Sequence, residues 1–367
     1  MNLSYIRASA LALFLVAGCE ESFIESPLPP LKEVPSDLAE ITFSATGQPS
    51  YPYAMLELSH PQGFMGFVIV NGEGKPVWFF RTVGGAVSFT RRENGNFVFL
   101  DLGRGLVEVT PKGNVVRELA QGPTGGRLIH NDVVATNRNS LLFLADEWRS
   151  SRDTLVNGVA IWEWYPEAGS TVKRWSSFDN LTPAFDRGPR YRPDDWLHAN
   201  SLSIGPRENL LVSSHFLDQV ISISADYRSY EWRLGGTRAT IPVDDPFSGQ
   251  HNAQEIQSGR VLMFDNGFER DFERYSRAVE YQINGSQARK VWEWRPQRDN
   301  WAKAIGAAWR IPNGNTFVAF GVTKDVPIGS TGPIEVYEVT VAGAVVWHLV
   351  IGGKVRSMYR ATPLPGL

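Results

Sequence analysis

The repeat that decides the fold is clearest in three stretches near the C-terminal end: Gly314–Val318 (GNTFV), Ile334–Val339 (IEVYEV) and Gly343–Trp347 (GAVVW). The preceding copy has the same three parts: Gly259–Phe264 (GRVLMF), Ala278–Ile283 (AVEYQI) and Lys290–Trp294 (KVWEW). Each copy is an apolar strand, a strand ending in acidic or aromatic residues, a glycine turn and a strand ending near Val-Trp. Alternating side chains in such strands bury one face against a neighbouring sheet.

Residues equivalent to the terminal tryptophan mark six copies of this repeat. These marker residues are 39 to 60 positions apart: Trp78, Arg117, Trp175, Trp232, Trp292 and Trp347. Units of this length with three or four strands are typical of β-propeller blades. A β-sandwich or barrel would not explain the recurring tryptophan. The sequence therefore predicts an all-β, six-bladed β-propeller, formed as one domain by residues 39–367 and with strands from about Ile41.

The N-terminal segment has the features of a lipoprotein signal. Arg7 precedes an apolar run at residues 8–16, and small residues precede Cys19, the only cysteine of the chain. The run is short for a membrane-spanning helix, and an exported chain with one cysteine cannot form an internal disulfide. We expect a signal peptide at residues 1–18 and a lipid on Cys19; the alternative is a cleaved signal beside an incidental cysteine.

The stretch after the signal is expected to hold the domain away from a membrane. Residues 19–38 contain four prolines among charged side chains, which is typical of an extended tether. Glu20 follows Cys19, and the inner-membrane retention rule expects an aspartate there. The expected location is the periplasmic face of the outer membrane or the cell surface, with the membrane contacted through the lipid anchor.

Composition excludes other partners. The net charge of −3 lacks the basic character of nucleic-acid-binding proteins, so no nucleic acid is expected. No segment after the signal is long and apolar enough to span a bilayer. The 12% aromatic content with 34 Gly and 23 Pro favours short strands and turns.

Three histidines occur in similar settings, each directly before or at the start of an apolar strand. They lie in His130-Asn131-Asp132, His198-Ala199-Asn200 and His251-Asn252-Ala253, in separate copies of the repeat. The innermost strands of a propeller surround its channel, so residues that open them meet at one mouth. We expect the three imidazoles in one cavity, braced by Asn200 and Asn252. The alternative is that each histidine only satisfies backbone groups at its blade entrance.

An arginine is expected to complete this site. Arg270 follows Asp265-Asn266-Gly267 on the loop after the His251 strand, and a guanidinium binds sulfate, phosphate or carboxylate with two parallel hydrogen bonds. Asn266-Gly267 is also typical of a plain turn, and Arg277 with Glu280 of a cross-strand or surface pair. A three-histidine zinc site is the weaker interpretation because of the nearby arginine, so no metal and no cofactor is expected.

These motifs, taken together, resemble the bacterial arylsulfotransferase family. The resemblance rests on Asp195–Ser201 (DWLHANS), Gln250–Ala253 (QHNA), Phe264–Gly267 (FDNG) with Arg270, Ser276–Tyr281 (SRAVEY) and Pro312–Asn315 (PNGN). It implies a six-bladed propeller that moves a sulfuryl group from an aryl sulfate ester to a phenol, without a nucleotide donor, through a sulfo-histidine. It also implies that His198, His251 and Arg270 are catalytic, with His130, Asn200 and Asn252 binding substrate.

Two positions differ from the family pattern. The nucleophilic histidine expected in the last blades is missing, because residues 311–347 contain none, and Ser330 and Thr331 stand near its place. Ser213-Ser214 is followed by His215, where the family usually has arginine; His348 is expected to be structural. Two function classes therefore stay open: a sulfuryl transferase that uses another histidine, and a non-catalytic propeller that binds a ligand or a protein.

Overall fold

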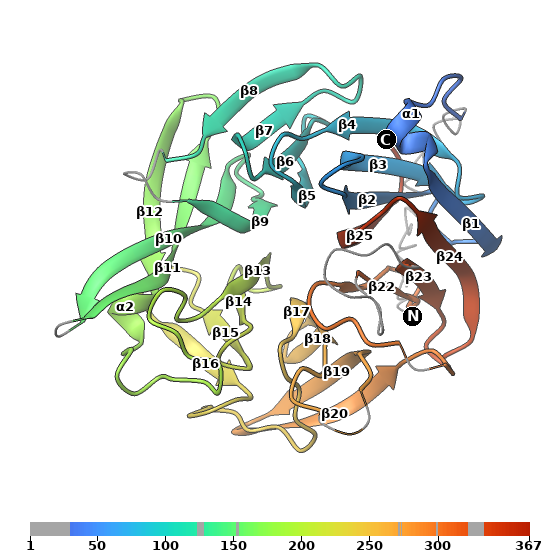
Figure 1. Ribbon diagram of the computed structural model, residues 1–367. Coiled ribbons are helices and arrows are strands. Elements are labelled where there is room, and N and C mark those ends of the chain that lie inside the picture. Colours follow the sequence, from blue (N-terminus) through green and yellow to red (C-terminus); the bar gives the residue numbers. More distant parts are fainter. Residues whose placement is uncertain are drawn as a thin grey trace, which may run out of the picture.

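The computed structural model describes residues 30–122, 128–151, 154–270, 272, 274–298, 300–321 and 334–367. In these residues, six antiparallel sheets surround a central axis as blades (Figure 1). The predicted all-β, six-bladed propeller is confirmed. The expected signal peptide and Cys19 lie outside the described residues. Across the described ranges, no helix is both long and apolar enough to cross a membrane.

Each blade is given from its inner to its outer strand. Blade 1 consists of β25 (Ser357–Leu364), β2 (Tyr53–Ser59), β3 (Met65–Asn71) and β4 (Pro76–Arg81). Blade 2 consists of β5 (Ala86–Arg91), β6 (Phe97–Asp101), β7 (Gly105–Val109) and β8 (Val115–Ala120). Blade 3 consists of β9 (Ile129–Ala135), β10 (Leu141–Ser151), β11 (Thr154–Tyr165) and β12 (Ser170–Ser176). Blade 4 consists of β13 (Ala199–Ile204), β14 (Leu210–Ser214), β15 (Gln219–Ile223) and β16 (Tyr230–Leu234). Blade 5 consists of β17 (His251–Gln257), β18 (Arg260–Asp265), β19 (Arg277–Asn284) and β20 (Gln287–Trp294). Blade 6 has five strands: β21 (Ala307–Arg310), β22 (Thr316–Phe320), β23 (Ile334–Val339), β24 (Val345–Gly353) and β1 (Ile41–Gly47). The short helices are α1 (Ser36–Ala39) and α2 (Ser177–Asn180).

Both ends of the chain close the ring. The N-terminal strand β1 pairs with β24 at the outer edge of blade 6, and the C-terminal strand β25 is the innermost strand of blade 1. Residues of the expected tether already pack against the propeller before residue 39. Leu38 is buried in the core, and the carboxylate of Asp37 bonds the guanidinium of Arg81. Closure of the ring lets blades 6 and 1 cover faces that the ends of an open array would leave exposed.

The six marker residues occupy equivalent positions, as the repeat predicted. Each lies in the fourth strand of its blade counted from the axis, one residue after a β-bulge: Trp78, Arg117, Trp175, Trp232, Trp292 and Trp347. A bulge increases the local twist of a strand. The glycine turn before it has a left-handed backbone, with φ of 83° at Gly113 and 87° at Gly343, a conformation that costs glycine little.

The hydrophobic core is divided among the blade interfaces. Six clusters form in the described residues, and each combines side chains of two neighbouring blades. Phe67 of β3 stacks on Phe99 of β6 with ring centroids 4.1 Å apart. Trp347 is buried between blades 6 and 1. Because every blade buries both faces this way, the inner strands are held firmly enough to position side chains at the axis.

A buried polar network links four blades near the axis. Arg360 of β25 bonds both carboxylate oxygens of Asp132 of β9 at 3.0 and 3.1 Å, and Asp132 also accepts the backbone N–H of Leu202 at 2.8 Å. Glu57 of β2 accepts the N–H of Ser88, and its second oxygen has no partner in the described residues. Burial raises the pKa of Glu57 to about 7, although Arg360 opposes this.

Candidate active site

Three inner strands begin with irregular backbone, which positions the predicted histidines at one mouth of the channel. His130 lies in β9, His198 directly before β13, and His251 opens β17. Each of these strands has a register shift at its start. His198 has a left-handed backbone, as have Asn131 and Asn252, and asparagine tolerates this conformation better than most residues. The shifts end regular pairing, so the side chains there are free to turn toward the axis.

Four rings form a continuous histidine row: His198, His215, His251 and Tyr359. Ring centroids are 5.2 Å apart between His198 and His215, 5.6 Å between His215 and His251, and 6.4 Å between His251 and Tyr359. His198 also stacks on Phe216 at 4.8 Å. Because blades 4, 5 and 1 all contribute, the row is a product of the closed propeller.

His251 uses both ring nitrogens for internal bonds. Its Nδ1 lies 2.7 Å from Oδ1 of Asn266, and its Nε2 accepts the backbone N–H of Ile305 at 3.3 Å. Burial lowers the pKa of His251 to about 3, so the ring is neutral at pH 7. Asn266 is thus the brace of His251, and not simply a turn residue. In this arrangement neither nitrogen is open to a substrate.

His215 and Tyr359 are the members of the row that sequence reasoning did not assign to the site. Nδ1 of His215 lies 2.9 Å from the carbonyl oxygen of Gly249. Burial lowers the pKa of His215 to about 2, together with the nearby His251, His198 and Arg190, which act in the same direction. The sequence signal was present as His215 in place of the family arginine, but that difference alone does not indicate a direction for the side chain.

His198 is paired with a carboxylate and keeps one free nitrogen. Its Nδ1 lies 2.6 Å from Oδ2 of Asp195, and its side chain is 39% exposed. Burial raises the pKa of Asp195, but the hydrogen bond and charge of His198, with Arg192, bring it below its ordinary value. A carboxylate on Nδ1 fixes the tautomer with the lone pair on Nε2. Among the described residues, Nε2 has no partner.

His198 and His130 line one cavity of about 330 Å³ together with Asp146, Asp195 and Arg192. Nε2 of His130 is buried and lies 3.5 Å from Oδ1 of Asp146. Burial lowers the pKa of His130, while the charge of Asp146 raises it. Two imidazoles, each beside its own carboxylate, therefore face the same space. This is the only pair of predicted site residues that the structure brings together in one described cavity.

Charge is distributed unevenly around this cavity. Arg190 and Arg360 act on the histidine row, where they help to lower the pKa values of His215 and His251. His130 is influenced by the acidic side chains of Asp146 and of Asp195, the partner of His198. Both arginines already have carboxylate partners, Arg190 in Asp218 and Glu269 and Arg360 in Asp132.

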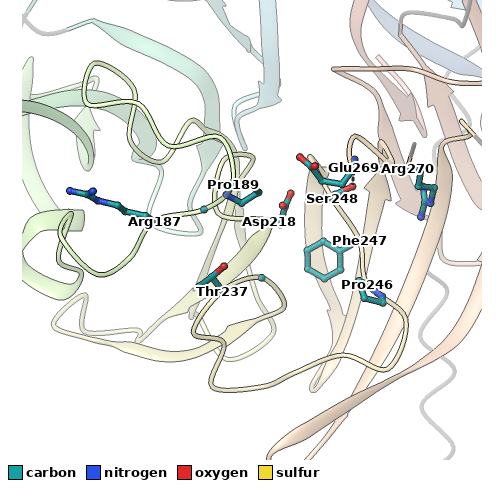
Figure 2. Close-up of a pocket in the computed structure, with 11 residues that line it drawn as sticks. Arg187, Pro189, Asp218, Thr237, Pro246, Phe247, Ser248, Glu269 and Arg270 are labelled. Atoms are coloured by element: carbon teal, nitrogen blue, oxygen red, sulfur yellow. Dashed lines mark hydrogen bonds between the residues drawn. The ribbon is translucent and has the colours of Figure 1, made fainter. Parts of the chain in front are cut away.

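Arg270 lies away from the histidine cavity, contrary to expectation. It lines a second cavity of about 630 Å³ with Asp218 and Phe247 (Figure 2). Its guanidinium bonds Asp265, donates to the carbonyl oxygen of Tyr275 at 2.9 Å and stacks over the Tyr275 ring at 4.2 Å. The physical reason is that the buried carboxylate of Asp265, five residues earlier, attracts the guanidinium first.

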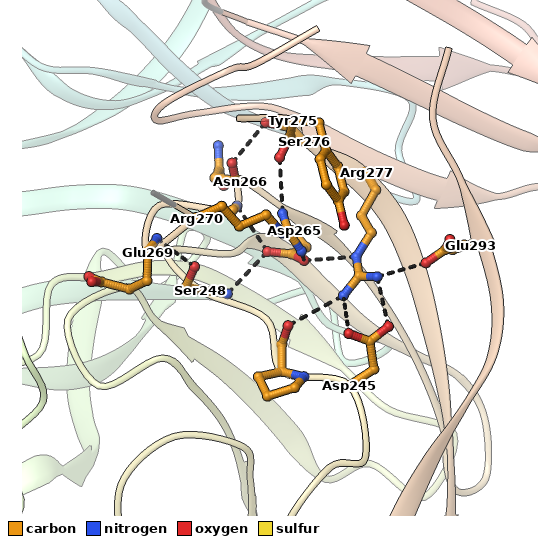
Figure 3. Close-up of polar contacts among 12 residues, drawn as sticks. Asp245, Ser248, Asp265, Asn266, Glu269, Arg270, Tyr275, Ser276, Arg277 and Glu293 are labelled. Atoms are coloured by element: carbon orange, nitrogen blue, oxygen red, sulfur yellow. Dashed lines mark hydrogen bonds and ion pairs between the residues drawn. The ribbon is translucent and has the colours of Figure 1, made fainter. Parts of the chain in front are cut away.

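Arg277 belongs to the same buried cluster, so the prediction of a surface pair with Glu280 was wrong. Arg277 donates from Nε to Asp265 at 2.9 Å and from one terminal nitrogen to Asp245 at 2.9 Å and Glu293 at 2.7 Å (Figure 3). Burial alone would lower its pKa, but the carboxylates of Asp245 and Asp265 raise it. Glu280 bonds Arg310 instead.

Asn200 and Asn252 connect inner strands and do not bond the histidines. The side-chain amide of Asn200 donates to the carbonyl oxygen of Gln250 at 2.7 Å. The side-chain oxygen of Asn252 accepts the N–H of Ala308 at 3.1 Å. The expected bracing was therefore wrong, since these residues join blade 4 to 5 and blade 5 to 6. Their assignment to substrate binding stays a prediction.

A metal centre has no support in the described ranges, where no three histidine, cysteine or acidic side chains are close enough to hold an ion. His348 stacks on Tyr337 at 4.2 Å in blade 6 and lies 3.6 Å from Glu335, as a structural residue would. Ser330 and Thr331 lie outside the described residues.

The fold and the imidazole-lined mouth define a class: a six-bladed propeller with a polar site at its axis. The family model described as Arylsulfotransferase (ASST) matches residues 55–348, and the chain belongs to that family. Comparison with curated proteins gives no match.

Solved structures are similar to this chain at low identity. A protein of unknown function from Bacteroides caccae is 14% identical, with a TM-score of 0.58, 85% of this chain covered and 99% of the other. A catalytically inactive virginiamycin B lyase from Staphylococcus aureus, crystallised with quinupristin, is 9% identical, with a TM-score of 0.46 and coverages of 85% and 99%.

Proposed function

We propose that this protein transfers a sulfuryl group from an aryl sulfate ester to a phenol by a ping-pong mechanism in which His198 is the nucleophile. One observation carries the proposal: the 2.6 Å contact with Asp195 orients an imidazole whose other nitrogen is free beside a cavity. Family membership supports the aryl sulfate substrates. His198 thus takes the role of the histidine that is missing from the last blades.

The chemistry follows from the polarity of the site. Nε2 of His198 attacks sulfur, a nitrogen–sulfur bond forms, and the sulfur–oxygen bond breaks so that aryl oxide leaves with the electron pair. Asp195 stabilises the positive charge that develops on the ring. The sulfuryl oxygens are expected on the row side, where the guanidinium groups of Arg190 and Arg360 lie, although each is paired with a carboxylate. In the second half-reaction a phenol takes the sulfuryl group and His198 is released.

The test is a single-turnover reaction with 4-nitrophenyl sulfate and no acceptor. We expect about one equivalent of nitrophenolate per protein, and a mass increase of one sulfuryl group on the peptide that contains His198. Adding phenol should then restore turnover and remove the adduct. Release of nitrophenolate without an adduct on any histidine would contradict the ping-pong mechanism, and an adduct on His215 or His251 would contradict the assignment to His198.

A non-catalytic binding propeller is the second candidate. The observation in its favour is that His251 and Arg270, two residues that the family resemblance makes catalytic, are both engaged in internal bonds. On this hypothesis the cavity binds an aryl anion without cleaving it. Saturable binding of phenyl sulfate with no aryl oxide released over hours would establish it and exclude the transferase.

We also propose that the protein is an exported lipoprotein anchored through Cys19, on the periplasmic face of the outer membrane or at the cell surface. The support is the short apolar run and the small residues before the only cysteine. Mass spectrometry of the mature N-terminus should find an acylated cysteine, and Cys19→Ser should remove the lipid. An unmodified cysteine in the native protein would refute the anchor.

A further inference from the structure

We propose that His130, oriented by Asp146, is the proton acceptor for the incoming phenol, opposite the nucleophile His198. This inference rests on the proposed function. It concerns the second half-reaction, in which the hydroxyl proton of the acceptor must leave as its oxygen bonds sulfur. His130 is assigned this role by its place in the cavity.

The geometry directs one nitrogen of His130 into the cavity. Nε2 is buried and lies 3.5 Å from Oδ1 of Asp146, and neither Nε2 nor Nδ1 has a hydrogen-bond partner in the described residues. An N–H directed toward Asp146 leaves the lone pair on Nδ1. His130 and His198 both line the cavity of about 330 Å³, which has room for one aromatic ring and a sulfuryl group.

The electrostatics suit proton uptake. Burial lowers the pKa of His130, which keeps the ring neutral at pH 7 and therefore able to accept a proton. The charged or titratable groups that act on it are Asp146 and Asp195, which favour the protonated ring, and His198, which opposes it. Arg192 also lines the cavity, but it is held by Asp195 and stacks on Phe216. Proton acceptance therefore creates an imidazolium beside two carboxylates.

The step balances in atoms and charge. The phenol oxygen bonds sulfur, its proton moves to Nδ1 of His130, and the nitrogen–sulfur bond breaks with its electron pair returning to Nε2 of His198. The proton on His130 is then passed to water or to the next departing aryl oxide. With 4-nitrophenyl sulfate as donor, the first half-reaction needs no proton because nitrophenolate is a stable anion.

The test separates the two half-reactions in His130→Gln and Asp146→Asn. We expect both variants to keep the nitrophenolate burst and the sulfuryl adduct on His198. Steady-state turnover by His130→Gln should fall at least about a hundredfold with weakly acidic phenols and change little with strongly acidic ones, which are already ionised. Asp146→Asn should show a smaller loss with the same dependence on acceptor acidity, as a positioning residue would.

His348→Gln is the matched control, because His348 also lies beside a carboxylate, 3.6 Å from Glu335, but in β24, the fourth strand of its blade from the axis. It should leave both half-reactions unchanged. Equal loss with every phenol, loss of the burst in His130→Gln, or full activity of that variant would each overturn the role of His130. Absence of a burst and adduct in the wild-type protein would instead refute the proposed function itself.

Discussion

Two polar regions lie at the same end of the propeller and differ in how their charges are satisfied. In the histidine cavity, and within the described residues, His198 bonds Asp195 through Nδ1 and has no partner on Nε2, while His130 lies beside Asp146 with no hydrogen bond on either ring nitrogen. In the cluster around Asp265, the carboxylate accepts the N–H groups of Ser248 and Gly267 and bonds both Arg270 and Arg277 (Figure 3). Hydrogen-bonding groups without a partner indicate a chemical role, and groups whose hydrogen bonds are all made indicate a structural role, although both regions contain the residue types of an anion site.

The largest expected effect is the loss of activity caused by a substitution in the histidine cavity. His198→Ala removes the proposed nucleophile, so kcat/KM for an aryl sulfate should fall at least about ten-thousandfold, or about 5 kcal/mol of transition-state stabilisation. Its unfolding midpoint should stay close to that of the wild type, because the side chain is 39% exposed. His251→Ala should lose less activity but more stability, since His251 is buried. The reverse order of the two activity losses would assign the attack to His251.

The second-largest effect is expected for Arg277→Ala, which lowers the stability of the cluster around Asp265. Removing a guanidinium that is 2% exposed leaves the buried Asp265 without a principal partner and releases Asp245 and Glu293. The free energy of unfolding should fall by about 4 kcal/mol. Urea denaturation measures this. The folded fraction should keep its kcat, and a variant of normal stability with lost activity would show that Arg277 serves the substrate.

The sequence predicted the blades well because a blade is a local unit. Each repeat contains its own turn glycines, strands with alternating side chains and a marker residue such as Trp347. Their pattern can therefore be recognised along the sequence. The site was predicted only in part, because its side chains are directed by partners from other segments. Asn266 and Ile305 engage His251 from later loops, and no spacing in the sequence indicates that.

The direction of an arginine is equally hard to predict. Arg270 was expected at the channel mouth because its loop leads there, but Asp265 lies within reach and is fully buried, so the strong pair forms locally. Asp195 is three residues before His198, and its role could have been inferred from that short spacing. The pairing of Asp146 with His130 crosses from β10 to β9 and depends on the register of the two strands.

Glu57 adds a third case to the comparison, because the fold accommodates this buried carboxyl group in its protonated, neutral form. Its folded-state pKa of about 7 exceeds its ordinary value of 4.5, so the folded protein binds a proton that the unfolded chain has lost. Its stabilising contribution is complete below about pH 4.5 and is lost as pH rises through 7. The total is about 3 kcal/mol.

Glu57→Gln should remove this part of the pH dependence. Stability measured by urea denaturation between pH 5 and 8 should fall with pH in the wild type and stay nearly flat in the variant, once the titration of the histidines is accounted for. Equal slopes in the two proteins would show that Glu57 is ionised in the fold, in company with Arg360.

The smallest expected effect concerns Arg270→Lys, which separates an anion-binding arginine from a structural one. An ammonium can keep one bond to Asp265 but cannot also reach the Tyr275 carbonyl and stack on the Tyr275 ring as the planar guanidinium does. The free energy of unfolding should fall by about 1 kcal/mol, while kcat/KM for an aryl sulfate should stay within about twofold of the wild type. If Arg270 instead turned toward the substrate during the reaction, the same substitution would leave stability nearly unchanged and lower kcat/KM more than tenfold, because one bidentate contact to the sulfuryl oxygens would be lost.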